Sequence, residues 1–503
     1  MAKIAIIGGG VAGLSAGIYA QLNGHTATVY ERHAVAGGNL TGWQRGEYHI
    51  DNCIHWLTGT NPATDTYRMW ETLGALGDGV EVSQGDVLFT CEYGGRTLSL
   101  CRDLGQMRRD MLALSRTPSD TVEIERLIRA IETVQGMSHI AGETHDRGYG
   151  VLRLMRSCPW LLRYNAMSTG ELASRFSHPL LRRFATSFLG ESFNSLALVV
   201  VCAHFCGENA GIPQGGSLAM ARRMADRFEA LGGKLYTGRE ALEIICRDGR
   251  ARAVRFADGE VVEADYVILA TDPTSVFGRM LDAPMPTRLK RWYDAPDMQR
   301  FSAYHCAFAL DAPRPPFRGD LALDVPSRYW GALHANTIAV REFSHEPSFS
   351  PEGKTILQTV SFCDEAEART CIALAADRDA YRERKAQIAR VTERLLLERF
   401  PEMTGELTCI DVWTPATYRR FTGAETGSFM SFVLPAGRLP VRLGGGVRGI
   451  PNVILATQWQ QAPGGLPIAA ECGRRAIEIV ARREASLKVT KRRAHATYAE
   501  WAT

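Results

Sequence analysis

Three glycines near the start of the chain, Gly8, Gly10 and Gly13, follow the apolar run of residues 4–7 in the pattern G-x-G-x-x-G. In this pattern the first glycine permits a tight turn, the second lets the backbone approach a pyrophosphate, and the third lets a helix pack closely on a strand. Glu31 ends the next apolar run, where a carboxylate can accept hydrogen bonds from ribose hydroxyls. Together these residues predict a dinucleotide site, and the acid argues against a site built for a 2′-phosphate.

A strand–helix–strand unit must position these residues. Residues 4–7 are apolar enough for a buried parallel strand. A helix is expected from the glycines to about Asn23, with Gly24 as its stop, and residues 26–30 are the second strand. A glycine-rich loop alone is weak support for nucleotide binding, but here the context that the motif requires is present.

A second glycine pair, Gly37 and Gly38, follows Glu31 and would bring backbone close to another part of the ligand. A plain nicotinamide-binding unit does not need such a pair, whereas FAD is long and binds in an extended form. The polar and aromatic segment 48–56 follows and could face a flavin. The sequence therefore favours FAD.

The later segments predict how the rest of the molecule is assembled. A helix is expected to start at residues 213–217 with Ser217 as its cap, before two hairpins and a buried strand at residues 264–270. Near the end, a strand at residues 452–457 leads through a glycine-containing loop to a helix at residues 468–482. A helix that starts after such a loop suits an anion or an electron-rich ring edge.

Two further regions predict a substrate subdomain. Residues 105–200 are expected to be mostly helical, and residues 290–420 combine strands at 301–310 and 355–362 with a charged helix at 377–400. Several aromatic residues in the second region could line an apolar cavity.

The expected fold class is α/β, with a Rossmann-type FAD-binding domain assembled from discontinuous segments and an α+β substrate domain of mixed helices and strands. The expected boundaries are residues 1–104, 207–288 and 422–485 for the FAD-binding domain, 105–206 and 289–421 for the substrate domain, and 486–503 for a polar tail.

Composition narrows the class of protein. The chain has 503 residues, 45% hydrophobic and 22% charged, with a net charge of +3, which is ordinary for globular proteins and gives no case for nucleic-acid binding. Its 12 cysteines are scattered, which suggests a reducing compartment. Cys202 and Cys206 flank His204 at helical spacing, but no second ligand pair is near them in sequence, so no metal site is predicted.

The expected location is the cytoplasm. No signal peptide is recognisable, and the longest apolar stretch is too short to span a bilayer. The basic cluster Lys491-Arg492-Arg493 would suit a solvated tail or a peripheral contact with a membrane surface. The sequence does not indicate an oligomeric state.

Three separated blocks together resemble the phytoene desaturase-like flavoproteins, which include carotenoid desaturases, carotenoid isomerases and retinol saturases. The blocks are the N-terminal glycines with Gly37 and Gly38, the segment 213–217 with its following hairpins, and the loop 463–465 with its following helix. The resemblance covers residues 3 to about 482, whereas the first block alone is shared with amine oxidases and many other flavoproteins.

The resemblance implies FAD that is bound without a covalent link. The cofactor-binding residues that it implies are Gly8, Gly10, Val11, Ala12, Gly13, Glu31, Arg32, Gly37, Gly38, Asn39, His55, Ala241, Ala270, Gln458, Trp459, Gly464, Gly465 and Leu466. Within this set Ala241 would touch the adenine, where the family often has valine, and residues 458–465 would lie along the isoalloxazine. The chain departs from the family at Asn39, which replaces a common basic residue, and at Leu466, which replaces a third glycine.

The resemblance also implies hydride transfer at flavin N5, acting on a carbon–carbon bond of a small lipophilic, polyene- or isoprenoid-like substrate. Desaturation, saturation and isomerisation all remain open, and NAD(P)H could be the electron donor. His55 is the first candidate to move a proton, and Asp51 is the second. A histidine with a purely structural role would give the same sequence pattern as His55, so that alternative stays open.

Two other functions remain as alternatives. A flavin amine oxidase-like enzyme would share the fold, but many amine oxidases use a lysine near the flavin, and the predicted substrate subdomain has few lysines, among them Lys354 and Lys385. A flavin-binding protein without catalytic activity is the other alternative.

Overall fold

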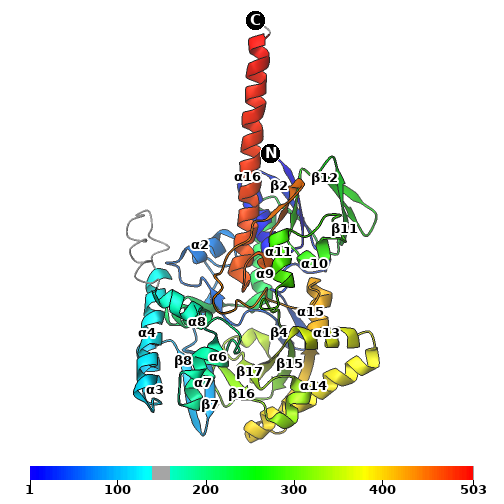
Figure 1. Cartoon of the computed structure of the whole chain (residues 1–503). Coiled ribbons are helices and arrows are strands. Elements are labelled where there is room, and N and C mark those ends of the chain that lie inside the picture. The colour runs from blue at the N-terminus through cyan, green and yellow to red at the C-terminus, as the bar shows by residue number, and fades with distance from the viewer. Residues whose placement is uncertain (139–158, 502–503) are drawn as a thin grey trace. The chain divides into compact units, whose positions relative to one another are not determined.

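The computed structural model describes residues 1–138 and 159–501, with side chains for residues 1–137 and 159–486. The chain forms two compact units (Figure 1). Unit 1 comprises Met1–Gly38, Ala221–Tyr293 and Arg442–Thr503, and unit 2 comprises Asn39–Met220 and Asp294–Val441.

Unit 1 is built on a six-stranded sheet with the order β10-β2-β1-β14-β21-β20, in which all strands except the edge strand β20 are parallel. The strands are β1 (Lys3–Ile7), β2 (Thr26–Tyr30), β10 (Lys234–Tyr236), β14 (Tyr266–Leu269), β20 (Gly446–Val447) and β21 (Ile450–Leu455). The chain leaves β1 toward β2 and later resumes on the other side of β1 with β14. Ligands of open α/β sheets bind beyond the carboxyl ends of the strands where the order reverses in this way.

Two helices of unit 1 begin at this edge of the sheet. α1 (Val11–Leu22) follows β1, and α16 (Leu466–Trp501), red in Figure 1, follows β21 through the short helix η4 (Gln458–Gln460). A Cβ atom on Gly473 would lie 2.3 Å from the carbonyl oxygen of Ala12, so the two backbones touch. The N-terminal ends of both helices, where N–H groups lack intrahelical partners, therefore lie beside the point where the strand order reverses.

The remaining elements of unit 1 are an antiparallel sheet and short helices. The three-stranded sheet consists of β11 (Ala241–Arg247), β12 (Arg250–Phe256) and β13 (Val261–Glu263). The helices are α10 (Pro273–Val276) and α11 (Thr287–Asp294), and α9 (Gly216–Ala230) begins in the sequence of unit 2 and ends in that of unit 1.

Unit 2 is built on a seven-stranded mixed sheet with the order β19-β15-β18-β17-β16-β7-β8, in which only the β16–β7 pair is parallel. Its strands are β7 (Val87–Tyr93), β8 (Arg96–Cys101), β15 (Ser302–Leu310), β16 (Asp320–Asp324), β17 (Thr337–Glu342), β18 (Thr355–Cys363) and β19 (Leu407–Trp413). The smaller strands are β3 (Gly42–Arg45) and β4 (Tyr48–Asp51), which form a hairpin, and β5 (Leu57–Thr58), β6 (Val82–Ser83) and β9 (Ala210–Pro213).

Helices form two apolar cores in unit 2. One core joins β7 and β8 to helices that include α4 and α8, and the other joins β15–β18 to α14, which is yellow in Figure 1. The helices are α2 (Asp65–Thr72), α3 (Leu104–Leu112), α4 (Pro118–Ser138), α6 (Thr169–Ser174), α7 (Pro179–Thr186), α8 (Ser195–Cys206), α12 (Trp330–Leu333), α13 (Glu365–Leu374), α14 (Arg378–Arg399) and α15 (Pro415–Thr422), with the short turns η1 (Ser327–Tyr329), η2 (Pro347–Phe349) and η3 (Pro401–Met403).

The structure confirms the predicted strand–helix–strand unit, the hairpins, the strands β15 and β18 and the helix α14. The last helix was predicted too short: α16 begins at Leu466 and continues to Trp501, so residues 486–501 of the expected tail are helical. The reason is that no proline follows Pro467 and no glycine follows Gly473 in this segment.

The compact units divide the chain differently from the expected domains. Residues 39–104, 207–220 and 422–441 pack within unit 2, because β7 and β8 extend its large sheet. The sequence had no signal for this pairing, since β7 pairs with a strand more than two hundred residues later. The expected boundaries were drawn by which segments bind the cofactor and not by which segments pack together. The assignment of these segments to cofactor binding stays a prediction.

Candidate cofactor and active site

Two glycines of the first loop are required by the protein's own packing. Gly8 has a φ of +106°, and a Cβ atom there would lie 2.7 Å from the carbonyl oxygen of Ala270. A Cβ atom on Gly13 would lie 1.9 Å from the carbonyl oxygen of Gly8. These two glycines therefore allow β1, α1 and the end of β14 to approach one another, as the sequence predicted for a tight turn and close packing.

Gly10 differs from both. Its φ of −75° is open to any residue, and a Cβ atom would meet nothing closer than the carbonyl oxygen of Gly37 at 3.7 Å, an ordinary contact. The protein itself therefore does not need a glycine here, whereas a ligand that approaches the backbone does. Gly10 is the N-cap of α1 and has no side chain that could cap this end of the helix. The amides of Val11, Ala12 and Gly13 are thus suited to an anionic group, and this cradle fits the pyrophosphate of a dinucleotide.

The carboxylate of Glu31 is held beside this cradle. Its Oε2 accepts a hydrogen bond of 2.8 Å from the Gly9 amide, and its Oε1 accepts one of 2.9 Å from the His33 amide. The residue is only 7% exposed. Each carboxylate oxygen can accept a further hydrogen bond, so the two amides fix the acid and still leave acceptors for ribose hydroxyls. The neighbouring Arg32 is exposed.

The second glycine pair lies against the first loop. The Gly37 amide donates to the carbonyl oxygen of Gly9 at 2.8 Å, and both Gly37 and Gly38 have positive φ values, +130° and +61°. The structure therefore brings together the N-terminal members of the predicted cofactor set that belong to unit 1. Ala270 follows β14 and faces Gly8, and Ala241 is a buried residue at the start of β11.

The loop before α16 is held by its own side chains. The Gly465 amide donates to Oε1 of Gln458 at 2.9 Å, and the Thr457 amide donates to Oε1 of Gln460 at 2.9 Å. Trp459 is buried and lies with its ring 5.7 Å from that of Tyr293. Trp459 thus packs into unit 1. Gly464 and Gly465, with φ values of +81° and +100°, lead into Leu466 at the first turn of α16.

Asn39, Asp51 and His55 belong to unit 2, where Asp51 holds the start of α9. Its carboxylate accepts the Ser217 amide at 2.5 Å, the Ser217 hydroxyl at 2.6 Å and the Cys53 amide at 3.1 Å. Asp51 is 1% exposed. The prediction that Ser217 caps this helix was therefore wrong, because the acid of a distant strand takes the place of the cap. Such a fully engaged carboxylate acts as an anchor for the segment that carries His55.

His55 lies in a charged cluster that the sequence did not reveal. Its Nδ1 is 4.0 Å from Oδ2 of Asp320, and Nε of Arg341 is 3.5 Å from the same oxygen. Arg341 also donates to the carbonyl oxygen of Ile54 at 2.9 Å. Burial and the charge of Arg341 lower the pKa of His55, so its imidazole is neutral at neutral pH and can accept a proton. Asp320 and Arg341 escaped prediction because nothing near them in the sequence marks them.

A second buried group of unit 2 centres on His305. Its Nε2 lies 3.1 Å from the hydroxyl of Tyr418, which donates to Oδ1 of Asn52 at 3.0 Å, and its ring stacks on Trp413 at 4.6 Å. Burial lowers the pKa of His305 and raises that of Tyr418, so both are neutral. Asn52 in turn donates to the carbonyl oxygen of Asn39 at 3.1 Å, which links this group to the predicted cofactor set.

Other kinds of site are not found in the described part of the chain. No group of three or more His, Cys, Asp or Glu side chains within residues 1–137 and 159–486 could hold a metal ion. None of the described helices is both long and apolar enough to cross a membrane.

Comparison with known proteins gives one match along almost the whole chain. The model of a family described as flavin containing amine oxidoreductase matches residues 11–480. Prolycopene isomerase 1 of an Oncidium hybrid cultivar is 26% identical over 315 residues, which cover 58% of this chain and 50% of that protein. Prolycopene isomerase of Arabidopsis thaliana is 22% identical, covering 84% and 73%. A lycopene-forming phytoene desaturase of Pseudescherichia vulneris is 23% identical, covering 56% and 58%.

The chain therefore spans about half of the length of the first of these relatives. Solved structures are similar over more of the chain. A protein of Pyrococcus furiosus has a TM-score of 0.59 at 15% identity, covering 95% of this chain and 97% of that one. Cyclohexylamine oxidase of Brevibacterium oxydans has a TM-score of 0.54 at 14% identity, covering 96% and 99%. These likenesses confirm the expected fold class.

Proposed function

The chain belongs to the family of flavin containing amine oxidoreductases and is a phytoene desaturase-like flavin oxidoreductase; from this premise we propose its reaction and substrate class. The proposal is that it binds FAD without a covalent link and acts on a carbon–carbon bond of a small lipophilic, polyene- or isoprenoid-like molecule. Desaturation, saturation and isomerisation are the three reactions it includes.

The observation that carries the FAD proposal is the space above Gly10. A glycine stands there although an alanine would fit the protein, and Gly10 lies at the start of α1, where the first backbone N–H groups have no intrahelical partner. Glu31 lies beside it with acceptors to spare for a ribose. A site for pyrophosphate together with a site for ribose supports a dinucleotide, and FAD is the flavin that has both.

The names of the relatives support the choice of substrate. Prolycopene isomerases and phytoene desaturases recur among them, at identities of 22–26%. When bound, the flavin would supply two-electron chemistry at the carbon–carbon bond. The chain's own contribution would be to hold the apolar substrate, exclude water and move a proton. We retain His55, neutral at neutral pH, as the candidate for the proton and give Asp51 a positioning role.

An amine oxidase-like reaction is the second candidate, because similar structures include an enzyme named cyclohexylamine oxidase. The lysines named above do not favour it. Lys354 is paired with Asp311 at 3.2 Å near the surface, and Lys385 lies on the charged helix α14. We therefore do not expect a primary amine to be the substrate, and we include an amine in the experiment below as the alternative.

The test is an absorbance spectrum of the purified protein, repeated without oxygen after adding NADH or NADPH, a polyene, or an amine. We expect flavin bands that heat denaturation releases into solution. Bleaching by a nicotinamide would indicate a saturase or an isomerase that uses reduced flavin, and bleaching by the polyene alone a desaturase. Bleaching by amines only would replace the proposed substrate class, and a protein that binds no FAD even after reconstitution would refute the proposal as a whole.

A further inference from the structure

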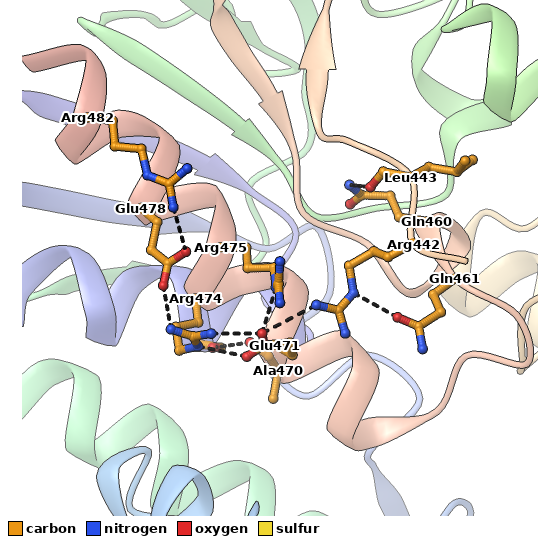
Figure 2. Close-up of polar contacts among 11 residues, drawn as sticks. Arg442, Leu443, Gln460, Gln461, Ala470, Glu471, Arg474, Arg475, Glu478 and Arg482 are labelled. Atoms are coloured by element: carbon orange, nitrogen blue, oxygen red, sulfur yellow. Dashed lines mark hydrogen bonds and ion pairs between the residues drawn. The ribbon is translucent and has the colours of Figure 1, made fainter. Parts of the chain in front are cut away.

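Arg442 joins the loop before α16 to the helix itself (Figure 2). Its Nε donates to Oε1 of Gln461 at 2.7 Å, and its Nη1 donates to Oε1 of Glu471 at 3.3 Å. Gln461 belongs to the loop, and Glu471 lies in the second turn of α16. One planar guanidinium therefore bridges the loop and the helix by hydrogen bonds to a side chain of each.

The Glu471 end of this bridge is rigid. Its carboxylate also accepts hydrogen bonds of 2.8 and 2.7 Å from Arg474 and one of 2.6 Å from Arg475, as Figure 2 shows. Burial disfavours its charge, but these arginines overcome that effect and hold the pKa of Glu471 below its ordinary value. Glu471 thus faces three guanidinium groups, Arg474 also pairs with Glu478, and three arginines against two carboxylates leave one excess positive charge at the first turns of the helix.

The loop end of the bridge is the part that must keep its shape. The adjacent Leu443 amide donates to the carbonyl oxygen of Gln460 at 2.7 Å, so residues 442 and 443 run along the loop. A Cβ atom on Gly465 would meet nothing within 4 Å, so space is open beside the start of α16. The first turns of α16 touch those of α1, since the Ser15 hydroxyl donates to the carbonyl oxygen of Ala470 at 2.6 Å. The loop therefore borders the same edge of the sheet as the pyrophosphate cradle.

We propose that Arg442 is a positioning residue for the flavin: through Gln461 and Glu471 it fixes the loop 458–465 and supplies positive charge at the start of α16. The inference rests on the proposed function, because it takes the bound group to be FAD. Positive charge next to a flavin favours its reduced, more negative state, so Arg442 would affect both the affinity for FAD and the reduction potential.

The test compares Arg442→Gln with Arg442→Lys and with a matched control. Arg482→Gln also removes one positive charge, this time from α16, but Arg482 is 79% exposed and its pairing with Glu478, at 3.6 Å, lies away from the loop. For each protein we would measure the melting temperature without FAD, the FAD dissociation constant, the reduction potential of the bound flavin, and hydrogen exchange of residues 456–465. Lysine keeps the charge but cannot bridge both acceptors.

We expect Arg442→Gln to weaken FAD binding by about tenfold or more, to lower the potential and to speed exchange in the loop, with a melting temperature near that of the parent. Arg442→Lys should restore the potential more fully than the loop exchange, and Arg482→Gln should match the parent. Unchanged FAD affinity, potential and exchange in Arg442→Gln, or equal effects in the control, would overturn the inference. If Arg442→Gln does not fold, Gln461→Ala replaces it as the test variant. Unchanged FAD affinity and unchanged hydrogen exchange of the loop in Gln461→Ala would then refute the proposed role of Arg442. A parent protein that binds no FAD would instead refute the proposed function.

Discussion

Replacing Gly10 with alanine separates the needs of the protein from those of its ligand. The φ of −75° is accessible to alanine, and the new methyl group would contact Gly37 and Gly38 only at ordinary distances of 3.7–4.0 Å. The same methyl group would stand next to the first N–H groups of α1, those of Val11 and Ala12, and would keep a phosphate away from them. We therefore expect Gly10→Ala to fold as the parent does and to lose most of its affinity for FAD.

The magnitudes follow from these contacts. As an N-cap, alanine destabilises the protein relative to glycine by roughly 0.5–1 kcal/mol. Alanine also reduces the conformational entropy of the unfolded chain, which stabilises the folded protein by about 0.4–1 kcal/mol. These effects nearly cancel, so the free energy of unfolding should change by less than about 0.5 kcal/mol. Displacing the pyrophosphate would cost two amide–phosphate hydrogen bonds of about 1.5–3 kcal/mol each, and the dissociation constant would rise by roughly 10² to 10⁴.

The assay is FAD titration of the apoprotein by flavin fluorescence, together with urea unfolding without FAD. Gly13→Ala is the contrasting variant, because its Cβ atom would lie 1.9 Å from the carbonyl oxygen of Gly8 and must move the backbone. It should destabilise the apoprotein by about 1–3 kcal/mol or more. A Gly10→Ala variant that binds FAD as tightly as the parent, or that unfolds like Gly13→Ala, would refute the interpretation of this space as the pyrophosphate site.

Three further predictions concern unit 2. Asp51→Asn removes the charge that holds the start of α9 and should lower the free energy of unfolding by about 1–3 kcal/mol in urea titration; an unchanged transition would show that the carboxylate is not the anchor. Burial lowers the pKa of His204 to about 4, whereas a histidine in the unfolded chain has an ordinary pKa of about 6.5. Between these values the unfolded state binds a proton that the folded state does not bind. The free energy of unfolding should therefore fall as the pH drops through this range, by about 2 kcal/mol at pH 5. His204→Gln should show a smaller loss between pH 7 and pH 5, and equal losses would contradict the assignment. His55→Gln should reduce turnover by roughly 10² or more while the flavin spectrum is unchanged, and full activity would return His55 to a structural role.

The sequence predicted the parts of unit 1 in which local pattern and global fold agree. The apolar run before Gly8, the glycine spacing and Glu31 each have a single local solution, and the structure has that solution. The second glycine pair was predicted to lie near another part of the cofactor, which stays a prediction; the structure adds that the Gly37 amide is bound to the carbonyl oxygen of Gly9 in the first loop.

The missed features depend on contacts between distant segments. Asp51 was expected to be free for chemistry, but it is engaged by Ser217, which follows it by 166 positions. Asp320 and Arg341 surround His55 only because β16 and β17 are neighbours in the large sheet. No spacing rule in a single sequence relates such residues, since their meeting depends on strand order. Fold-level recognition therefore predicted the strands, helix and turns around the first glycine loop, whereas it missed the polar groups of unit 2.

The packing of α16 on α1 has a consequence for the order in which the protein is made. The hydrogen bond between Ser15 and Ala470 joins residues that are 455 positions apart. At 5–20 residues per second, a ribosome would need roughly 20–90 s to reach the second after making the first. During that interval β1 and α1 lack both β21 and α16, so the apolar face of α1 stays uncovered. The nascent chain should therefore depend on chaperones over this period, and FAD should be captured only after synthesis is nearly complete.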